Sequence, residues 1–78
     1  MLKKEKKLII TFHTSDMAFA TEKVCKDENI DGKLISAPRT LSADCGISFA
    51  TGPLNRERIL DALVRHSIEY DSVSELEV

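Results

Sequence analysis

Seventy-eight residues are enough for one domain and too few for two, because a second domain would lack the chain to build its own core. The chain is 42% hydrophobic and 31% charged, which is too apolar for a disordered protein. Its net charge of −2 argues against a nucleic-acid binder, since such proteins gather an excess of cations on one face. We therefore expect one globular domain over residues 1–78. Because the core of so short a chain is small, a homodimer would help to stabilise it.

The first seven residues are basic, with four lysines interrupted by Glu5. We interpret residues 1–7 as a flexible, solubilising start to the chain rather than as an arm that binds phosphates or a membrane surface. No apolar run exceeds four residues, so the sequence contains no candidate membrane span and no signal-peptide core. We therefore expect a cytoplasmic protein that binds no membrane, in a compartment where free thiols stay reduced.

The first predicted strand covers residues 8–13, where β-branched and aromatic side chains predominate. Three candidate N-cap residues follow at 14–16, and they predict a helix over about 16–28. Its apolar stripe recurs at spacings of three and four residues and consists of Met17, Ala20 and Val24. Residues 29–32 stop this helix, and Gly32 among them readily takes the left-handed backbone that closes a helix.

The rest of the chain predicts two more strands, a second helix and a last strand. Residues 33–37 and 47–51 have strand character, and Pro38 ends the first of these strands because it cannot donate to a sheet ladder. A second helix is expected over about 56–67, with an apolar stripe at Ile59, Leu63 and Val64. Residues 70–78 supply a fourth strand. Val73 is out of phase with Leu76 and Val78, which predicts either a bulge or a late start.

The order β-α-β-β-α-β predicts an α+β fold, a two-layer ferredoxin-like sandwich in which two helices cover one face of an antiparallel sheet. We expect the stripes of both helices to bury against Leu8, Ile10 and Phe12. A right-handed crossover makes strands 8–13 and 33–37 parallel, with strand 47–51 between them. The connections at 13–16, 38–46 and 67–71 should then share one edge of the molecule.

The connection 38–46 is nine residues long, whereas a hairpin usually needs two to five. Long loops on rigid scaffolds commonly carry functional sites. This loop contains Cys45, whose thiol becomes nucleophilic only as the thiolate. Arg39 is a permanent cation in the same loop and would favour the thiolate, whereas Asp44 would oppose it.

Two smaller features of the loop also suit a reactive thiol. Ser42 is placed to cap a helical turn that runs into Cys45, and Gly46 would let another molecule approach the sulfur. The alternative is that Cys45 is a small packed residue ahead of a strand, and the residue types alone leave the two interpretations equally good. For Cys25, on the second half of the first helix, packing is the preferred interpretation. We expect no disulfide between the two cysteines, because the helix carries Cys25 away from the loop edge.

The loop follows a recognisable pattern, Pro38-Arg39-x-Leu41-Ser42-x-x-Cys45-Gly46. It resembles the P-R-x-(I/L)-S-x-x-C-G signature of a small selenium/sulfur carrier-protein-like family, and the likeness extends over nearly the whole chain. The resemblance implies that Cys45 accepts sulfur or selenium as a persulfide or selenopersulfide and passes it to an acceptor enzyme. A donor such as a cysteine desulfurase would load it. Known sulfur carriers with a C-P-x-P motif carry their cysteine at the first helix, and this chain has no such motif.

On this interpretation Cys45 is the carrier thiol, Arg39 stabilises its anion, Ser42 orders the loop and Gly46 keeps the sulfur accessible. His13 ends the first strand near the same edge and would serve as a base or cation for Cys45. The other interpretation of His13 is a polar strand end that faces water.

The protein would then be a protein substrate in a relay rather than a self-contained enzyme. Two alternatives stay open: a module that binds a small anion or a peptide without covalent chemistry, and a thiol redox sensor. No metal or cofactor is expected, since the cysteines lack CxxC spacing and the chain has no glycine-rich phosphate loop. We also expect Cys45 to lie near the start of the first helix, where the helix dipole would stabilise a thiolate.

Overall fold

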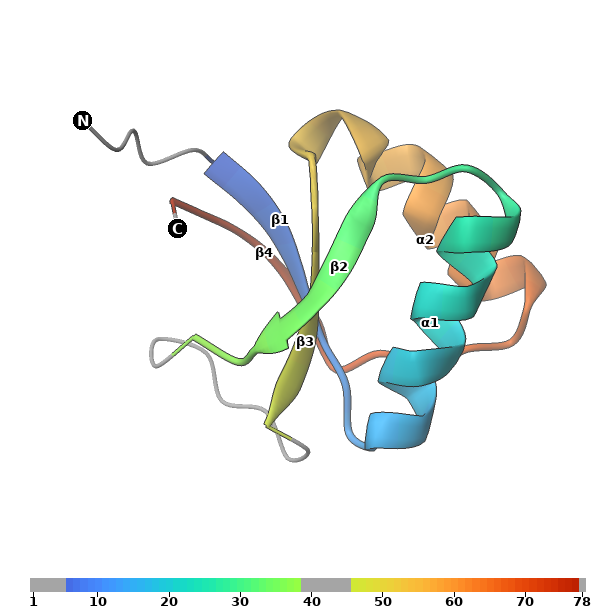
Figure 1. Ribbon diagram of the computed structural model, residues 1–78, viewed down its shortest axis with the longest axis horizontal. Helices are drawn as coiled ribbons and strands as arrows, with labels where there is room; N and C mark the ends of the chain where they lie inside the picture. Colours follow the sequence, from blue (N-terminus) through green and yellow to red (C-terminus); the bar gives the residue numbers. More distant parts are fainter. Residues whose placement is uncertain (1–5, 39–45, 78) are drawn as a thin grey trace.

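The computed structural model describes residues 6–38 and 46–77. Its elements in chain order are β1 (Lys6–Thr11), α1 (Ser15–Asp27), β2 (Gly32–Ser36), β3 (Ile47–Thr51), a 3-10 turn η1 (Pro53–Asn55), α2 (Arg56–Arg65) and β4 (Ser72–Glu77). The strands form one antiparallel sheet in the order β2-β3-β1-β4, and both helices lie on the same side of it (Figure 1). This is the predicted α+β sandwich, with β3 between the parallel strands β1 and β2.

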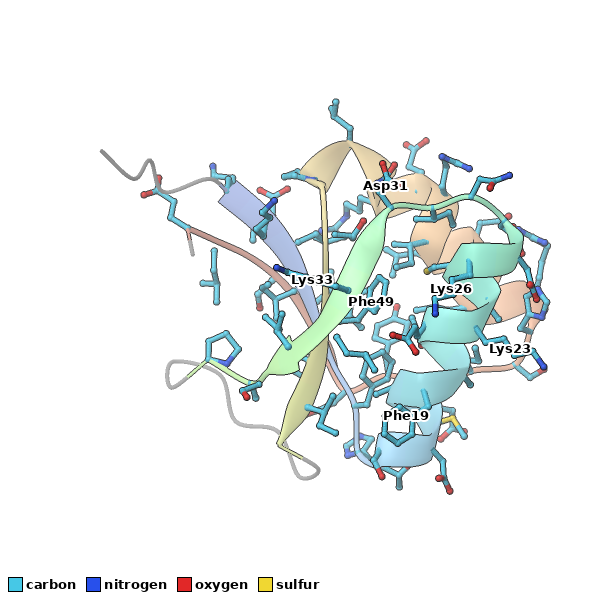
Figure 2. All side chains as sticks on the ribbon, in the orientation of Figure 1. Phe19, Lys23, Lys26, Asp31, Lys33 and Phe49 are labelled. Atoms are coloured by element: carbon cyan, nitrogen blue, oxygen red, sulfur yellow. The ribbon has the colours of Figure 1, made fainter. Side chains whose placement is uncertain are left out.

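The hydrophobic core lies between the helices and one face of the sheet. Alternate residues of β1 and its extension, Leu8, Ile10 and Phe12, are fully buried there. Phe49, which pairs with Ile10 across β1 and β3, extends from the sheet toward the helices (Figure 2). The helices contribute small and aliphatic side chains to the same cluster, among them Ala18, Val24, Ile59, Ala62 and Leu63. Period-two strands and period-3.6 helices thus bury one face each.

The predicted helix stripes are confirmed except at one position. Val24, Ile59 and Leu63 are buried, and Met17 and Ala20 pack partly buried against the core. The prediction for Val64 was wrong, because its side chain is 74% exposed. Successive helix residues point about 100° apart, so once Ile59 and Leu63 face the sheet, Val64 turns outward.

Both helices end in the same way, at a residue other than glycine in the left-handed region. The residues are Asn29, with φ of 57°, and Ser67, with φ of 56°. In each case the next residue donates its N–H back into the helix, Ile30 to the Cys25 carbonyl at 2.8 Å and Ile68 to the Leu63 carbonyl at 2.9 Å. The two isoleucines are buried, as is usual for this capping motif.

This motif sets the helix ends. It ends α2 at Arg65 and α1 at Asp27, whereas the sequence predicted helix to about Ser67 and Glu28. Across residues 6–38 and 46–77, neither helix has the length and apolar character that crossing a membrane requires.

The strand boundaries differ from the prediction at both ends of β1. The strand begins at Lys6, so the last two residues of the basic segment lie within the sheet rather than in a flexible tail, and it ends at Thr11 instead of His13. Its pairing with β4 is uninterrupted from Lys6↔Glu77 to Thr11↔Ser72. The alternative of a bulge in β4 is therefore wrong, and the strand starts late, at Ser72. Val73 pairs with Ile10 and Leu76 with Lys7, so the two side chains project from opposite faces of the sheet.

Candidate functional site

The β1–α1 connection, the start of β3 and the α2–β4 connection lie at one edge of the sheet (Figure 1). The β1–β3 ladder ends at the pair Thr11↔Ser48. Two further residues along each strand lead to His13 and Gly46, so these two residues follow the same end of the ladder. From the α2–β4 connection, Asp71 approaches His13, with 3.5 Å between the carboxylate Oδ1 and the imidazole Nε2.

A cavity of about 300 Å³ opens at this edge. It is lined by His13 and Thr14 before α1, by Met17 in the first turn of α1, and by Ser67 and Glu69 after α2. Of these five residues, the sequence singled out only His13 as a candidate site residue. It predicted Thr14 as a possible helix cap, Met17 as a core residue and Ser67 as the end of a helix. The shared edge was the available signal, because it already grouped the β1–α1 and α2–β4 connections.

The N-terminus of α1 lies at the cavity. Thr14 is the N-cap residue and has extended backbone, with φ of −133° and ψ of 151°, but its side chain makes no capping hydrogen bond. Amide groups in a first helical turn have no partner within the helix and carry the positive end of the helix dipole. Asp16 is the acidic residue of that turn. This end of the cavity therefore offers backbone amides that favour an anion.

Gly46 has left-handed backbone, with φ of +73°, which explains why glycine suits this position. A side chain would meet no described atom within 4 Å, so space alone does not require glycine. The Gly46 carbonyl accepts a hydrogen bond from the Ala37 N–H at 3.0 Å, which adds one bond beyond the last β2–β3 pair. Gly46 thus fixes the direction in which the chain enters β3.

The other predicted members of the site, Arg39, Ser42 and Cys45, lie outside the described residues. Their predicted roles, and the predicted closeness of Cys45 to α1, stay predictions. His13 is described: its side chain is 56% exposed and approaches Asp71. Its interaction with Asp71 provides a structural role, and the proposed assistance to Cys45 remains a prediction.

Cys25 is a free cysteine on α1 and is buried in the core, with 2% of its surface exposed. Burial, reinforced by the charge of Glu28, raises the pKa of its thiol to about 11. A thiol with this pKa stays protonated near neutral pH, and the protonated form is a poor nucleophile. The packing interpretation of Cys25 therefore agrees with its surroundings.

Charged side chains at the C-terminal ends of both helices form a separate cluster. The Glu28 carboxylate accepts hydrogen bonds from Arg65 Nη2 at 2.5 Å and pairs with His66 Nε2 at 3.0 Å. Arg65 also donates to Asp61 at 2.8 Å. The hydrogen bond from Arg65 holds the pKa of Glu28 below its ordinary value. These contacts join α1 to α2 and are remote in sequence from the Cys45 loop.

A scan of known families gives one match, to a family described as "Putative Se/S carrier protein-like", over residues 7–75 of this chain. Comparisons with curated proteins and with solved structures find no match. Within residues 6–38 and 46–77, no three histidine, cysteine or acidic side chains gather as a metal site would require. The family match spans β1 to β4 and includes the Cys45 loop. The chain therefore belongs to the selenium/sulfur carrier protein-like family.

Proposed function

We propose that this protein carries sulfur or selenium on Cys45, as a persulfide or selenopersulfide, and delivers it to a partner enzyme. The chain belongs to this family, and the observation that carries the proposal is that its two cysteines, Cys25 and Cys45, differ in their suitability for group transfer. Cys25 is buried and its pKa is raised to about 11, so it is unsuited to group transfer. Cys45 directly precedes Gly46, which enters the sheet at the edge that holds the cavity and the start of α1.

The chemistry asked of Cys45 is an exchange between sulfur atoms. The Cys45 thiolate attacks the outer sulfur of a persulfide on the donor protein, the donor's S–S bond breaks, and the donor cysteine leaves as a thiolate. The Cys45 persulfide that results is an anion. An acceptor thiolate then attacks its outer sulfur and releases the Cys45 thiolate. Each exchange forms one S–S bond and breaks one, so neither step needs an external oxidant or reductant.

Two features support a stabilised anion at this edge. The first-turn amides of α1 lack a side-chain cap from Thr14 and favour negative charge. Arg39, in the same loop as Cys45, would add a full positive charge. Environments of this kind lower the pKa of a thiol from about 8.5 to roughly 3.5–7.5. A thiol in that range is ionised near neutral pH, where a carrier must react.

The test is sulfur loading followed by intact mass. The whole protein is incubated with a cysteine desulfurase and cysteine, and its mass is measured without reduction. We expect the protein to gain one sulfur atom, the Cys45→Ser variant to gain none, and the matched Cys25→Ala variant to load like the unchanged protein. Equal loading of the Cys45→Ser variant would refute the assignment.

Alkylation gives an independent measure of the same site. At pH 7, iodoacetamide should modify Cys45 well before Cys25, and Arg39→Ala should slow the reaction at Cys45 without changing the thermal midpoint of unfolding. If Arg39→Ala reacts at the unchanged rate, Arg39 has no part in activating the thiol. If Cys45 loads no sulfur and reacts no faster than a free cysteine, a binding module without covalent chemistry becomes the better account.

A further inference from the structure

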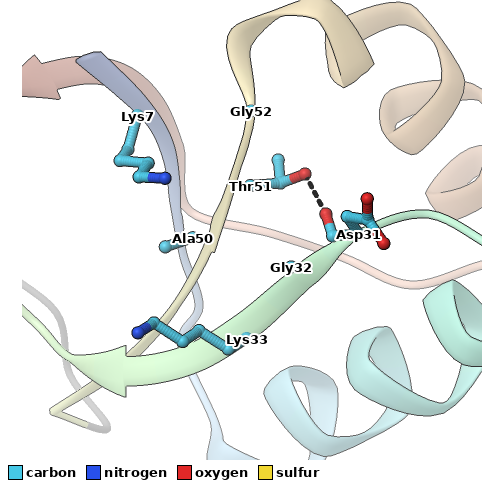
Figure 3. Close-up of a pocket in the computed structure, with 7 residues that line it drawn as sticks. All are labelled: Lys7, Asp31, Gly32, Lys33, Ala50, Thr51 and Gly52. Carbon is cyan, nitrogen blue, oxygen red and sulfur yellow. Dashed lines mark hydrogen bonds between the residues drawn. The ribbon is translucent and has the colours of Figure 1, made fainter. Parts of the chain in front are cut away.

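A second cavity, of about 260 Å³, opens at the opposite end of the sheet from Gly46. It is lined by Lys7 of β1, by residues 31–33 at the start of β2 and by residues 50–52 at the end of β3 (Figure 3). The carrier chemistry is proposed for Cys45, which precedes Gly46 at the start of β3, whereas this cavity lies at the end of β3. What the cavity binds is therefore a separate question from the proposed function.

The strand register brings Lys7 and Lys33 to the same face of the sheet. Lys33 pairs with Ala50, and Ala50 pairs with Ile9, which is two residues from Lys7. Since side chains alternate along a strand, all four project from the face opposite the helices. Ordinary strand spacings put the Cα atoms of the two lysines about 12 Å apart, with Ala50 between them. Figure 3 shows both lysine side chains extending to the side on which Ala50 lies.

The floor between the lysines is built from small residues and is held in place. On the helix side of the sheet, beneath the cavity, a Cβ atom on Gly32 would overlap the Phe49 ring and lie 2.8 Å from the Ala50 carbonyl oxygen, so glycine is what lets β2 and β3 pack there. The Thr51 hydroxyl donates to the Asp31 carbonyl, which ties the start of β2 to the end of β3 (Figure 3). A site whose walls are already fixed loses less entropy when a ligand binds.

The charge at the cavity is opposite in sign to that of the whole chain. Among the described residues that line it, Lys7 and Lys33 carry ammonium groups and Asp31 carries a carboxylate, whereas the chain as a whole carries −2. Within the described part of the chain, no ion pair involves Lys33. In Figure 3 the Asp31 carboxylate lies at the start of β2, away from the two ammonium groups. An anion between the lysines would thus meet two cations before it meets the carboxylate.

We propose that this cavity binds a small tetrahedral oxyanion or phosphate group between Lys7 and Lys33. The ammonium group of lysine is a compact charge that suits phosphate oxygens, and two of them favour a dianion over a monoanion. The cavity is slightly smaller than the roughly 300–1,000 Å³ of sites for drug-sized ligands, so the ligand is a small one. Ala50 and Gly52 leave room for it above the sheet.

The probe is inorganic phosphate, added at constant ionic strength to the isotopically labelled whole protein while amide chemical shifts are recorded. We expect saturable shifts at Gly32, Ala50 and Gly52. Either Lys7→Gln or Lys33→Gln should weaken binding about fivefold, as expected for the loss of an exposed charge pair. The matched control is Lys23→Gln, because Lys23 is an exposed lysine on α1, far from the cavity (Figure 2).

Several outcomes would overturn the proposal. They are shifts that do not saturate, shifts spread over the surface lysines, and equal weakening by Lys23→Gln. Titration with sodium chloride alone gives the effect of general screening, and shifts of the same size and position there would mean that no phosphate site exists. Sulfur loading of Cys45 should be unchanged in Lys33→Gln, so failure of one proposal leaves the other standing.

Discussion

Ser67 offers a sharp test of how the helices end. It holds a left-handed backbone, with φ of 56°, two residues after Arg65, the last residue of α2. In this region the Cβ atom of an L-residue crowds the following carbonyl oxygen, at a cost of roughly 1–2 kcal/mol. Ser67→Gly removes that cost but adds about 0.5–1 kcal/mol of backbone entropy to be lost on folding. We expect a net gain of about 0.5–1 kcal/mol in the free energy of unfolding.

For a domain of this size, that gain corresponds to a rise of about 2–8 °C in the thermal midpoint of unfolding. Circular dichroism during heating measures it. Asn29→Gly, at the equivalent place after α1, should gain less, because asparagine tolerates the left-handed region better than serine does.

Ser67→Ala is the matched control, because it removes the hydroxyl and keeps Cβ. We expect it to leave the midpoint nearly unchanged. If Ser67→Ala raises the midpoint as much as Ser67→Gly does, the gain comes from the hydroxyl and the argument from backbone strain is wrong. A midpoint lowered by Ser67→Gly would refute it as well.

Two further predictions concern α2 and its contact with α1. Leu63→Ala should destabilise the protein by about 2–5 kcal/mol in denaturant unfolding, since Leu63 is fully buried. Val64→Ala, at the neighbouring exposed position, should change the free energy of unfolding by less than about 0.5 kcal/mol. Comparable losses from the two substitutions would contradict the assigned faces of α2. The pKa of Glu28 is lower in the folded protein than its ordinary value of 4.5. Its ion pairs therefore stabilise the fold at pH values above 4.5, and this stabilisation is lost as the pH falls through the lower pKa of the folded protein. Thermal midpoints of the unchanged protein and Glu28→Gln should therefore differ at pH 7 and converge in acid, and a constant difference would exclude the titration of Glu28 as its cause.

Most of the fold could be predicted from local patterns. The β-branched and aromatic run of β1, the strand character of the later segments and the apolar stripes of the two helices predicted the order of elements. The handedness of the crossover then placed β3 between β1 and β2. Val64 was the failure among the predicted core residues. A stripe of apolar residues on a helix is wider than the face that the sheet covers, and only packing decides which of its edges is exposed.

For the site, the sequence pattern of residues 38–46 identified the family, and the rule that connections meet at one edge predicted the grouping of His13 with the α2–β4 connection. The pairing of His13 with Asp71 needed the tertiary structure, since the two residues come from connections far apart in the chain. The same is true of Glu28 with Arg65, which lie 37 positions apart.

The sequence by itself therefore determined the helices and strands and the thiol-bearing loop, which depend on neighbouring residues, and the topology, which follows from their order and the handedness of the crossover. What only the tertiary structure decided depends on register and on close packing. A shift of one residue in β1 would turn Lys7 to the helix side of the sheet and separate it from Lys33, because successive side chains of a strand point to opposite faces. Alternation with the buried Leu8 and Ile10 indicates the face of Lys7, but no local pattern places Lys33 beside it. The pairing of Ile9 with Ala50, and of Ala50 with Lys33, does so.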